Sequence, residues 1–173
     1  MSDTEVRLDF ARPDRVGFDE AILCARKTHD QLITIMDALL EKQTSSLMTR
    51  LEPEVFEAFP DSYKAKLDYD PISKMGYFNW TPPGDTGLLP VAVVSAGTSD
   101  MPQAAEVIRT LTYFGVPTGQ FIDIGVAGLW RLLGQVERLQ EFPVVVAIAG
   151  MDGALPSVLG GLVSGSIICV PTS

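Results

Sequence analysis

The sequence of 173 residues has little of the residue types on which several common chemistries depend. It contains one histidine, His29, and two cysteines, Cys24 and Cys169, which lie far apart and fit no metal-ligand spacing. A serine–histidine catalytic pair and a histidine metal site are therefore not expected, and no metal ligands are assigned. His29 is interpreted as an exposed residue near a helix start. Both cysteines are predicted to be buried apolar thiols in a reducing compartment.

Positive charge is also scarce, since 13 Lys and Arg face 22 Asp and Glu and the formal net charge is −9. This balance excludes a phosphate backbone or an anionic membrane surface as a partner. The longest apolar runs, such as residues 144–149, are too short to span a bilayer, and residues 1–5 are acidic with no hydrophobic signal region. We expect a soluble, cytoplasmic protein. A small anionic ligand is compatible with this charge, because backbone N–H groups and helix N-termini can hold phosphate.

The chain divides into two halves of different character, residues 1–88 and 89–173. The first half carries most of the charged residues and shows helical spacing over residues 29–42, with Thr28 or Asp30 as a cap. A shorter helix is expected after Pro53, and residues 63–85 show no sustained period. The first half is therefore predicted to be a small, mainly helical domain followed by a linker.

The second half alternates short apolar runs with helical patterns, which is typical of βαβ units. Continuously apolar strands indicate a parallel sheet that is buried on both faces. Right-handed crossovers then give an α/β fold with a doubly wound, flavodoxin-like sheet, in which ligands bind at the carboxyl ends of the strands. The expected strands are residues 89–95, 121–124, 142–149 and 166–170, and the expected helices are 102–114, 127–139 and 155–163.

Three small-residue turns follow these strands and are predicted to meet at one edge of the sheet. In the first turn, Gly97 allows close approach of a ligand, Ser99 offers a hydroxyl, and Asp100 can cap the next helix, whose free N–H groups favour an anion. A well-capped turn without a ligand remains the alternative. The candidate phosphate- and substrate-binding residues are Gly97, Thr98, Ser99, Asp100, Gly125, Val126, Ala127, Gly128, Gly150, Met151, Gly153 and Ala154.

Asp152 is the candidate catalytic acid or base, because it is a carboxylate between two glycines of the third turn. The alternative is that Asp152 caps the following helix. None of the three turns matches the dinucleotide fingerprint or carries the lysine of a P-loop.

Taken in order, these motifs resemble the LarB family, which is related to carboxyaminoimidazole ribonucleotide mutase (PurE). The resemblance extends over the whole chain, including an N-terminal part around residues 15–28. The segments that carry it are 91–100 (ending Ala-Gly-Thr-Ser-Asp), 125–129 (Gly-Val-Ala-Gly-Leu), 149–158 (Ala-Gly-Met-Asp-Gly-Ala-Leu-Pro-Ser-Val) and 171–173 (Pro-Thr-Ser).

The resemblance implies a pyridinium-3,5-biscarboxylic acid mononucleotide synthase with a PurE-like nucleotide-binding domain, acting in biosynthesis of the nickel-pincer nucleotide. Its substrates would be nicotinic acid adenine dinucleotide and carbon dioxide or bicarbonate. The pyridinium ring would be carboxylated after a cysteine adds to it, and the phosphoanhydride would then be hydrolysed to release AMP. No built-in cofactor is implied, Mg²⁺ can accompany the phosphates, and a homo-oligomer, an octamer in the family, is expected.

The chain departs from the family pattern at three places. Asp152 stands where glutamate is usual, which shortens the reach of the proposed base, and Trp130 stands where histidine is common. The family continues after Pro-Thr-Ser with a segment that carries the catalytic cysteine, so the α/β domain is expected to be truncated and this chain inactive in carboxylation. Cys169 is not a substitute, since it is expected in the core.

Three other functions stay open at this point. The retained loops could form a nucleotide-binding module without chemistry, or the chain could be a regulatory protein, since relatives are described as circadian phase modifiers. A mutase of the purine pathway would need a histidine near the second turn, where residues 125–130 have none.

Overall fold

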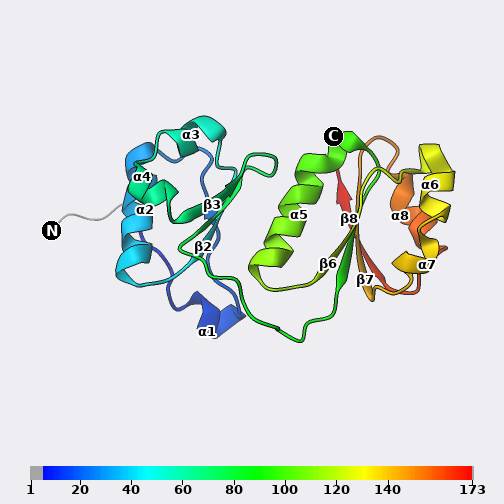
Figure 1. The fold of residues 1–173 in the computed structure, drawn as a ribbon, viewed down its shortest axis with the longest axis horizontal. Coiled ribbons are helices and arrows are strands. Elements are labelled where there is room, and N and C mark those ends of the chain that lie inside the picture. The colour runs from blue at the N-terminus through cyan, green and yellow to red at the C-terminus, as the bar shows by residue number, and fades with distance from the viewer. Residues whose placement is uncertain (1–5, 173) are drawn as a thin grey trace. The chain divides into compact units, whose positions relative to one another are not determined.

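The computed structural model describes residues 6–172 and divides into two units, Met1–Pro82 and Pro83–Ser173. Figure 1 shows the elements of each unit. The acidic residues 1–5 and Ser173 of the Pro-Thr-Ser motif lie outside the described residues. The division falls after residue 82, whereas the sequence suggested residue 88.

The first unit contains a mixed four-stranded sheet in the order β1-β2-β4-β3. Strand β1 pairs parallel with β2, whereas β4 pairs antiparallel with β2 and β3. The prediction of a mainly helical N-terminal domain is therefore wrong. The elements are α1 (Arg12–Val16), β1 (Ile22–Leu23), α2 (His29–Glu41), β2 (Ser46–Thr49), α3 (Pro53–Glu57), α4 (Asp61–Lys64), β3 (Leu67–Asp70) and β4 (Met75–Phe78).

The strands of this sheet escaped the sequence analysis because they give no alternating pattern. Each of the longer strands has four residues, and all four residues of β4 are buried, so no exposed face marks a period of two. The hairpin of β3 and β4 lies inside the segment predicted as a linker, residues 63–85. Within the described chain, the exposed stretch without helix or strand is shorter and covers residues 81–89.

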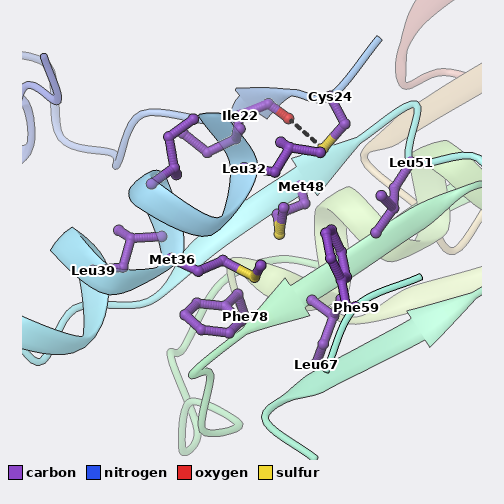
Figure 2. Close-up of a cluster of buried hydrophobic side chains, with 11 residues drawn as sticks. Ile22, Cys24, Leu32, Met36, Leu39, Met48, Leu51, Phe59, Leu67 and Phe78 are labelled. Atoms are coloured by element: carbon purple, nitrogen blue, oxygen red, sulfur yellow. Dashed lines mark hydrogen bonds between the residues drawn. The ribbon is translucent and has the colours of Figure 1, made fainter. Parts of the chain in front are cut away.

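The predicted helix at residues 29–42 is confirmed as α2. Thr28 and Gln31 form a capping box, in which each side chain bonds the other residue's backbone N–H. The apolar face of α2 packs on the sheet, and Figure 2 shows these side chains together with those of the strands. The most buried members of this core are Leu32, Met36, Met48, Leu51 and Phe78.

The second unit contains an all-parallel four-stranded sheet in the order β6-β5-β7-β8, which confirms the predicted parallel sheet. The strand order changes direction at β5, which has β6 on one side and β7 on the other. The elements are β5 (Val91–Ser95), the 3₁₀ turn η1 (Thr98–Asp100), α5 (Met101–Tyr113), β6 (Thr118–Phe121), the 3₁₀ turn η2 (Val126–Gly128), α6 (Leu129–Leu133), α7 (Val136–Leu139), β7 (Val144–Ala149), α8 (Ala154–Leu159) and β8 (Ser166–Pro171).

Helices cover both faces of this sheet (Figure 1). Helix α5 packs on the face that carries Val93 and Ile148, and the helices α6, α7 and α8 pack on the face that carries Val94 and Ala147. Right-handed crossovers explain this arrangement, because the chain moves from β5 to β6 in one direction and from β6 to β7 in the other.

Several predicted boundaries in the second unit are wrong. The helix expected at residues 127–139 is two short helices, because Gly134 interrupts it. The helix expected at residues 155–163 ends at Leu159, before two glycines. The strand expected at residues 121–124 is β6, which starts at Thr118, since Gly119 and Gln120 give no apolar signal.

The two cysteines have different environments. Cys24 is buried, as predicted, with 5% of its surface exposed. Cys169 is exposed, so its assignment to the core is wrong. The reason is that β8 pairs with β7 alone in the described part of the chain, and its neighbour Ile168 is also exposed. No helix within residues 6–172 is long and apolar enough to cross a membrane.

Candidate functional site

A pocket of about 410 Å³ lies at the carboxyl ends of the parallel strands. It is formed by the segments that follow β5, β6, β7 and β8, which meet at one edge of the sheet. This is the edge where doubly wound sheets bind ligands. The lining residues are Ala96, Gly97, Ser99, Asp100, Gly125, Val126, Ala127, Ala149, Gly150, Met151, Asp152, Gly153, Ala154, Leu155 and Thr172.

The structure brings most of the candidate residues together in this pocket, but not Thr98 or Gly128. It adds Thr172, which was not among the candidates. Thr172 follows β8 directly, so its place at the carboxyl-terminal edge could have been inferred from the strand pattern. Its hydroxyl contact, described below, could not.

The loop after β5 offers unpaired hydrogen-bond donors. Thr98 and Ser99 are the first two residues of η1, and no partner for either N–H or for the Ser99 hydroxyl is present among the described residues. Gly97 has an extended backbone with φ of −136°, and a Cβ placed on it would meet only ordinary contacts, the nearest being Ser99 Oγ at 3.5 Å. The protein itself therefore does not require glycine at position 97.

Asp100 holds this loop in shape instead of capping α5. Its side chain is buried, with 6% of the residue exposed. One carboxylate oxygen accepts the Gly97 N–H at 2.9 Å, and the other accepts the Thr172 hydroxyl at 2.6 Å. No side chain caps α5, so the predicted cap by Asp100 is wrong.

Other glycines around the pocket have reasons within the chain. A Cβ on Gly125 would lie 2.5 Å from the Ala96 carbonyl oxygen, and one on Gly150 would lie 2.8 Å from Thr172 Oγ1. Gly153 has a φ of +59°, which disfavours other residues. The two glycines around Asp152 therefore reflect packing and backbone shape, and Gly97 alone among these four lacks such an explanation.

Asp152 lines the pocket and is exposed. Helix α8 has Gly153 as its N-cap and no side-chain cap, so the alternative interpretation of Asp152 as a helix cap is wrong. No hydrogen-bond partner of its carboxylate is present in residues 6–172. Asp152 is thus a carboxylate at the pocket that has no structural partner.

Comparison with known proteins gives the family. Residues 3–80 match the LarB/PurE-like N-terminal domain. An uncharacterized protein of Methanocaldococcus jannaschii is 33% identical over 179 residues, and the alignment covers 97% of this chain and 68% of the relative. The chain belongs to the LarB/PurE-like family. The resemblance expected from the motifs is confirmed at this level, and the first unit, with its mixed sheet, contains the family's N-terminal domain.

The pocket of this LarB/PurE-like chain has an unusual charge pattern for an anion site. Its charged lining residues are Asp100 and Asp152, and it includes no lysine, arginine or histidine. The nearest cation along the chain, Arg131, pairs with Asp123 and does not line the pocket. An anion there would be held by N–H groups and hydroxyls. The described residues hold no group of three or more His, Cys, Asp or Glu that could bind a metal.

Neither cysteine lies at the pocket. Cys24 belongs to the core of the first unit, where burial raises the pKa of its thiol to about 12. Cys169 is exposed on β8, in the register position opposite Ala147, and does not line the pocket. The lining therefore has a candidate base, Asp152, but no thiol nucleophile.

Proposed function

We propose that this LarB/PurE-like protein binds a nucleotide in the pocket of its second unit, with the phosphate at the loop Gly97–Asp100. The unpaired N–H groups of Thr98 and Ser99 at the start of α5 carry this proposal. They are donors without partners in the described chain, and the helix dipole adds to their attraction for an anion. The strand order, which matches a flavodoxin-like sheet with its switch between β5 and β7, supports the same position.

The proposed ligand is nicotinic acid adenine dinucleotide. A pyridinium ring carries a positive charge, and the unpartnered carboxylate of Asp152 complements it in a pocket that lacks cationic side chains. This electrostatic pattern favours a pyridine dinucleotide over a purely anionic ligand of the same size. Mg²⁺ would reach the site with the phosphates.

In the LarB reaction the ring is carboxylated and the phosphoanhydride is hydrolysed. A thiolate adds to the pyridinium, the neighbouring ring carbon becomes nucleophilic and attacks carbon dioxide, and a base then removes the ring proton. Asp152 is the proposed base. Because neither Cys24 nor Cys169 lines the pocket, the geometry of this chain favours nucleotide binding without turnover.

Calorimetric titration with nicotinic acid adenine dinucleotide, with and without Mg²⁺, tests the binding site. We expect Ser99→Glu to remove binding, because it places a negative charge beside the phosphate. The matched control is Ser157→Glu, which makes the same change at an exposed position of α8 outside the pocket lining. Equal binding by the Ser99→Glu variant and the wild type would refute the assignment.

The same preparation separates binding from catalysis. Incubation of the wild type with nicotinic acid adenine dinucleotide and bicarbonate is expected to give no AMP and no carboxylated pyridinium. Release of AMP would show that a nucleophile acts at the pocket that we have not placed. A mutase function has no support, because no histidine lines the pocket.

We also propose a homo-oligomer. Apolar side chains are exposed on α6, where Leu129, Trp130 and Leu133 have exposed fractions of 44%, 77% and 53%. Clustered apolar surface of this kind is usually buried between subunits. Light scattering coupled to size exclusion should give a mass several times 18.7 kDa, and a monomer would contradict the proposal.

A further inference from the structure

We propose that Asp100 and Thr172 form a positioning pair, which ties the carboxyl end of β8 to the loop Gly97–Asp100 and sets the direction of that loop's N–H groups. The effect on a ligand rests on the proposed function. The tie itself is a property of the ligand-free chain, so it can be tested separately.

The contacts of Asp100 carry this inference. Its carboxylate is buried and joins two donors that lie 72 residues apart in sequence, the Thr172 hydroxyl at 2.6 Å and the Gly97 N–H at 2.9 Å. Hydrogen bonds to a carboxylate are stronger than those between neutral groups. Each oxygen of Asp100 already has a partner, so this residue is suited to hold the loop more than to contact a ribose or phosphate.

Electrostatics supports a geometric role. The negative charge of Asp100 lies beside a loop proposed to bind phosphate, and like charges repel. A carboxylate at this position weakens anion binding by its charge and can favour binding only through the loop shape that it maintains. Removing the charge while keeping the shape should therefore not reduce affinity.

Thr172 is held from a third direction by the end of β7. Its backbone N–H donates to the Ala149 carbonyl at 3.0 Å, and its side chain and carbonyl occupy the space where Gly150 would otherwise have a Cβ. The tie therefore connects the segments after β5, β7 and β8. A movement of the segment after β8 would reach the phosphate loop through Asp100.

A double-mutant cycle in the full chain tests the pair, with Thr172→Val, Asp100→Ala and the double variant titrated with nicotinic acid adenine dinucleotide. Loss of one hydrogen bond to a charged group predicts an affinity about tenfold lower for Thr172→Val. We expect Thr172→Ser to stay near the wild type and the double variant to lose no more than Asp100→Ala. Losses that multiply would show that Thr172 acts on the ligand independently and would overturn the proposal.

A ligand-free measurement makes the test independent of the proposed function. Hydrogen exchange of the Gly97 amide is expected to become faster in Thr172→Val and to stay slow in Asp100→Asn, whose amide can accept from Gly97 and donate to Thr172. Thr110→Val is the control, since its hydroxyl bonds within α5 to the Glu106 carbonyl. If the wild type binds no nucleotide, the proposed function fails while this exchange still decides the tie. Unchanged Gly97 exchange in Thr172→Val would refute the tie, whatever the ligand.

Discussion

At the scale of single residues, the glycines around the pocket have different origins. Gly125 and Gly150 are required by neighbouring backbone and side-chain atoms, and Gly153 by its positive φ. Gly97 has an ordinary backbone and room for a Cβ. A glycine that the protein does not need is best explained by a ligand that approaches the backbone closely.

This difference predicts opposite results for two alanine substitutions. Gly97→Ala should leave stability unchanged or raise it by up to about 1 kcal/mol, because alanine restricts the unfolded chain, yet should abolish nucleotide binding. Gly125→Ala should destabilise the protein by roughly 1–3 kcal/mol through the clash with Ala96. Urea unfolding and calorimetric titration of both variants check this. Full binding by Gly97→Ala would argue against close approach at position 97.

Asp152 is predicted to act on the ligand and not on the fold. Asp152→Asn should change the unfolding free energy by less than about 0.5 kcal/mol, since the side chain is exposed and caps nothing. It should weaken binding of nicotinic acid adenine dinucleotide several-fold, on the order of the loss of one partly screened charge pair, and leave AMP binding unchanged. Glu137→Gln, on the exposed side of α7, is the control for the change in net charge. Equal losses for both ligands would contradict a contact between Asp152 and the pyridinium ring.

The Cys24 thiol should make the stability of the first unit depend on alkaline pH. Burial raises its pKa in the folded state to about 12, above the ordinary value of 9.0, so the fold favours the neutral thiol. Its contribution is complete below pH 9 and is lost as pH rises from 9 toward 12. Unfolding by urea between pH 8 and 11 should therefore show a steeper loss for the wild type than for Cys24→Ala. Parallel curves would contradict the burial argument, and labelling at pH 8 should modify only the exposed Cys169.

At the scale of elements, sequence reasoning worked where the pattern was long. Helix α2 shows its apolar face over 13 residues, and β7 is apolar throughout, so both were predicted nearly to the residue. The N-terminal sheet was missed because four-residue strands buried on both faces have no period, and β6 was shifted because Gly119 and Gln120 look like a turn. The site was predicted from strand ends, but the contact of Thr172 with Asp100 depends on side-chain geometry that no local pattern carries.

The hairpin of β3 and β4 can be distinguished from a linker by proline substitution. Tyr77 lies in β4, which pairs with strands on both sides, so Tyr77→Pro should destabilise the first unit by about 3 kcal/mol or more. Thr81→Pro, in the exposed segment that follows, should have little effect. Circular dichroism and urea unfolding measure both. Tolerance of proline at position 77 would restore the linker interpretation.

At the scale of the whole molecule, each unit buries a core of its own. The first unit has one apolar cluster beneath α2, and the second has one on each face of its sheet. The connecting segment, residues 81–89, is exposed along its whole length and forms no helix or strand. Units built in this way are expected to keep their folds when the connection is cut.

Limited proteolysis with thermolysin, which cleaves before large apolar residues, should therefore act first at Leu88 and Leu89. Their exposed fractions are 49% and 69%. Mass spectrometry should show two fragments that divide near residue 88, and both should persist while the intact chain disappears. Early cleavage inside α2 or β7 would show that a unit is less stable than its buried core implies.

The all-parallel pairing in the second unit also bears on the order in which the chain folds. In the first unit, Leu67 pairs with Phe78, only 11 residues later, so this hairpin closes a short loop. In the second unit, Val91 pairs with Thr118, 27 residues later, and with Val144, 53 residues later. Contacts between distant residues form slowly, because the entropy of loop closure opposes them until the sheet is complete. During synthesis the first unit can reach its native state while the central strands β5 and β7 still wait for each other, and the pocket, which needs both, is among the last features to form.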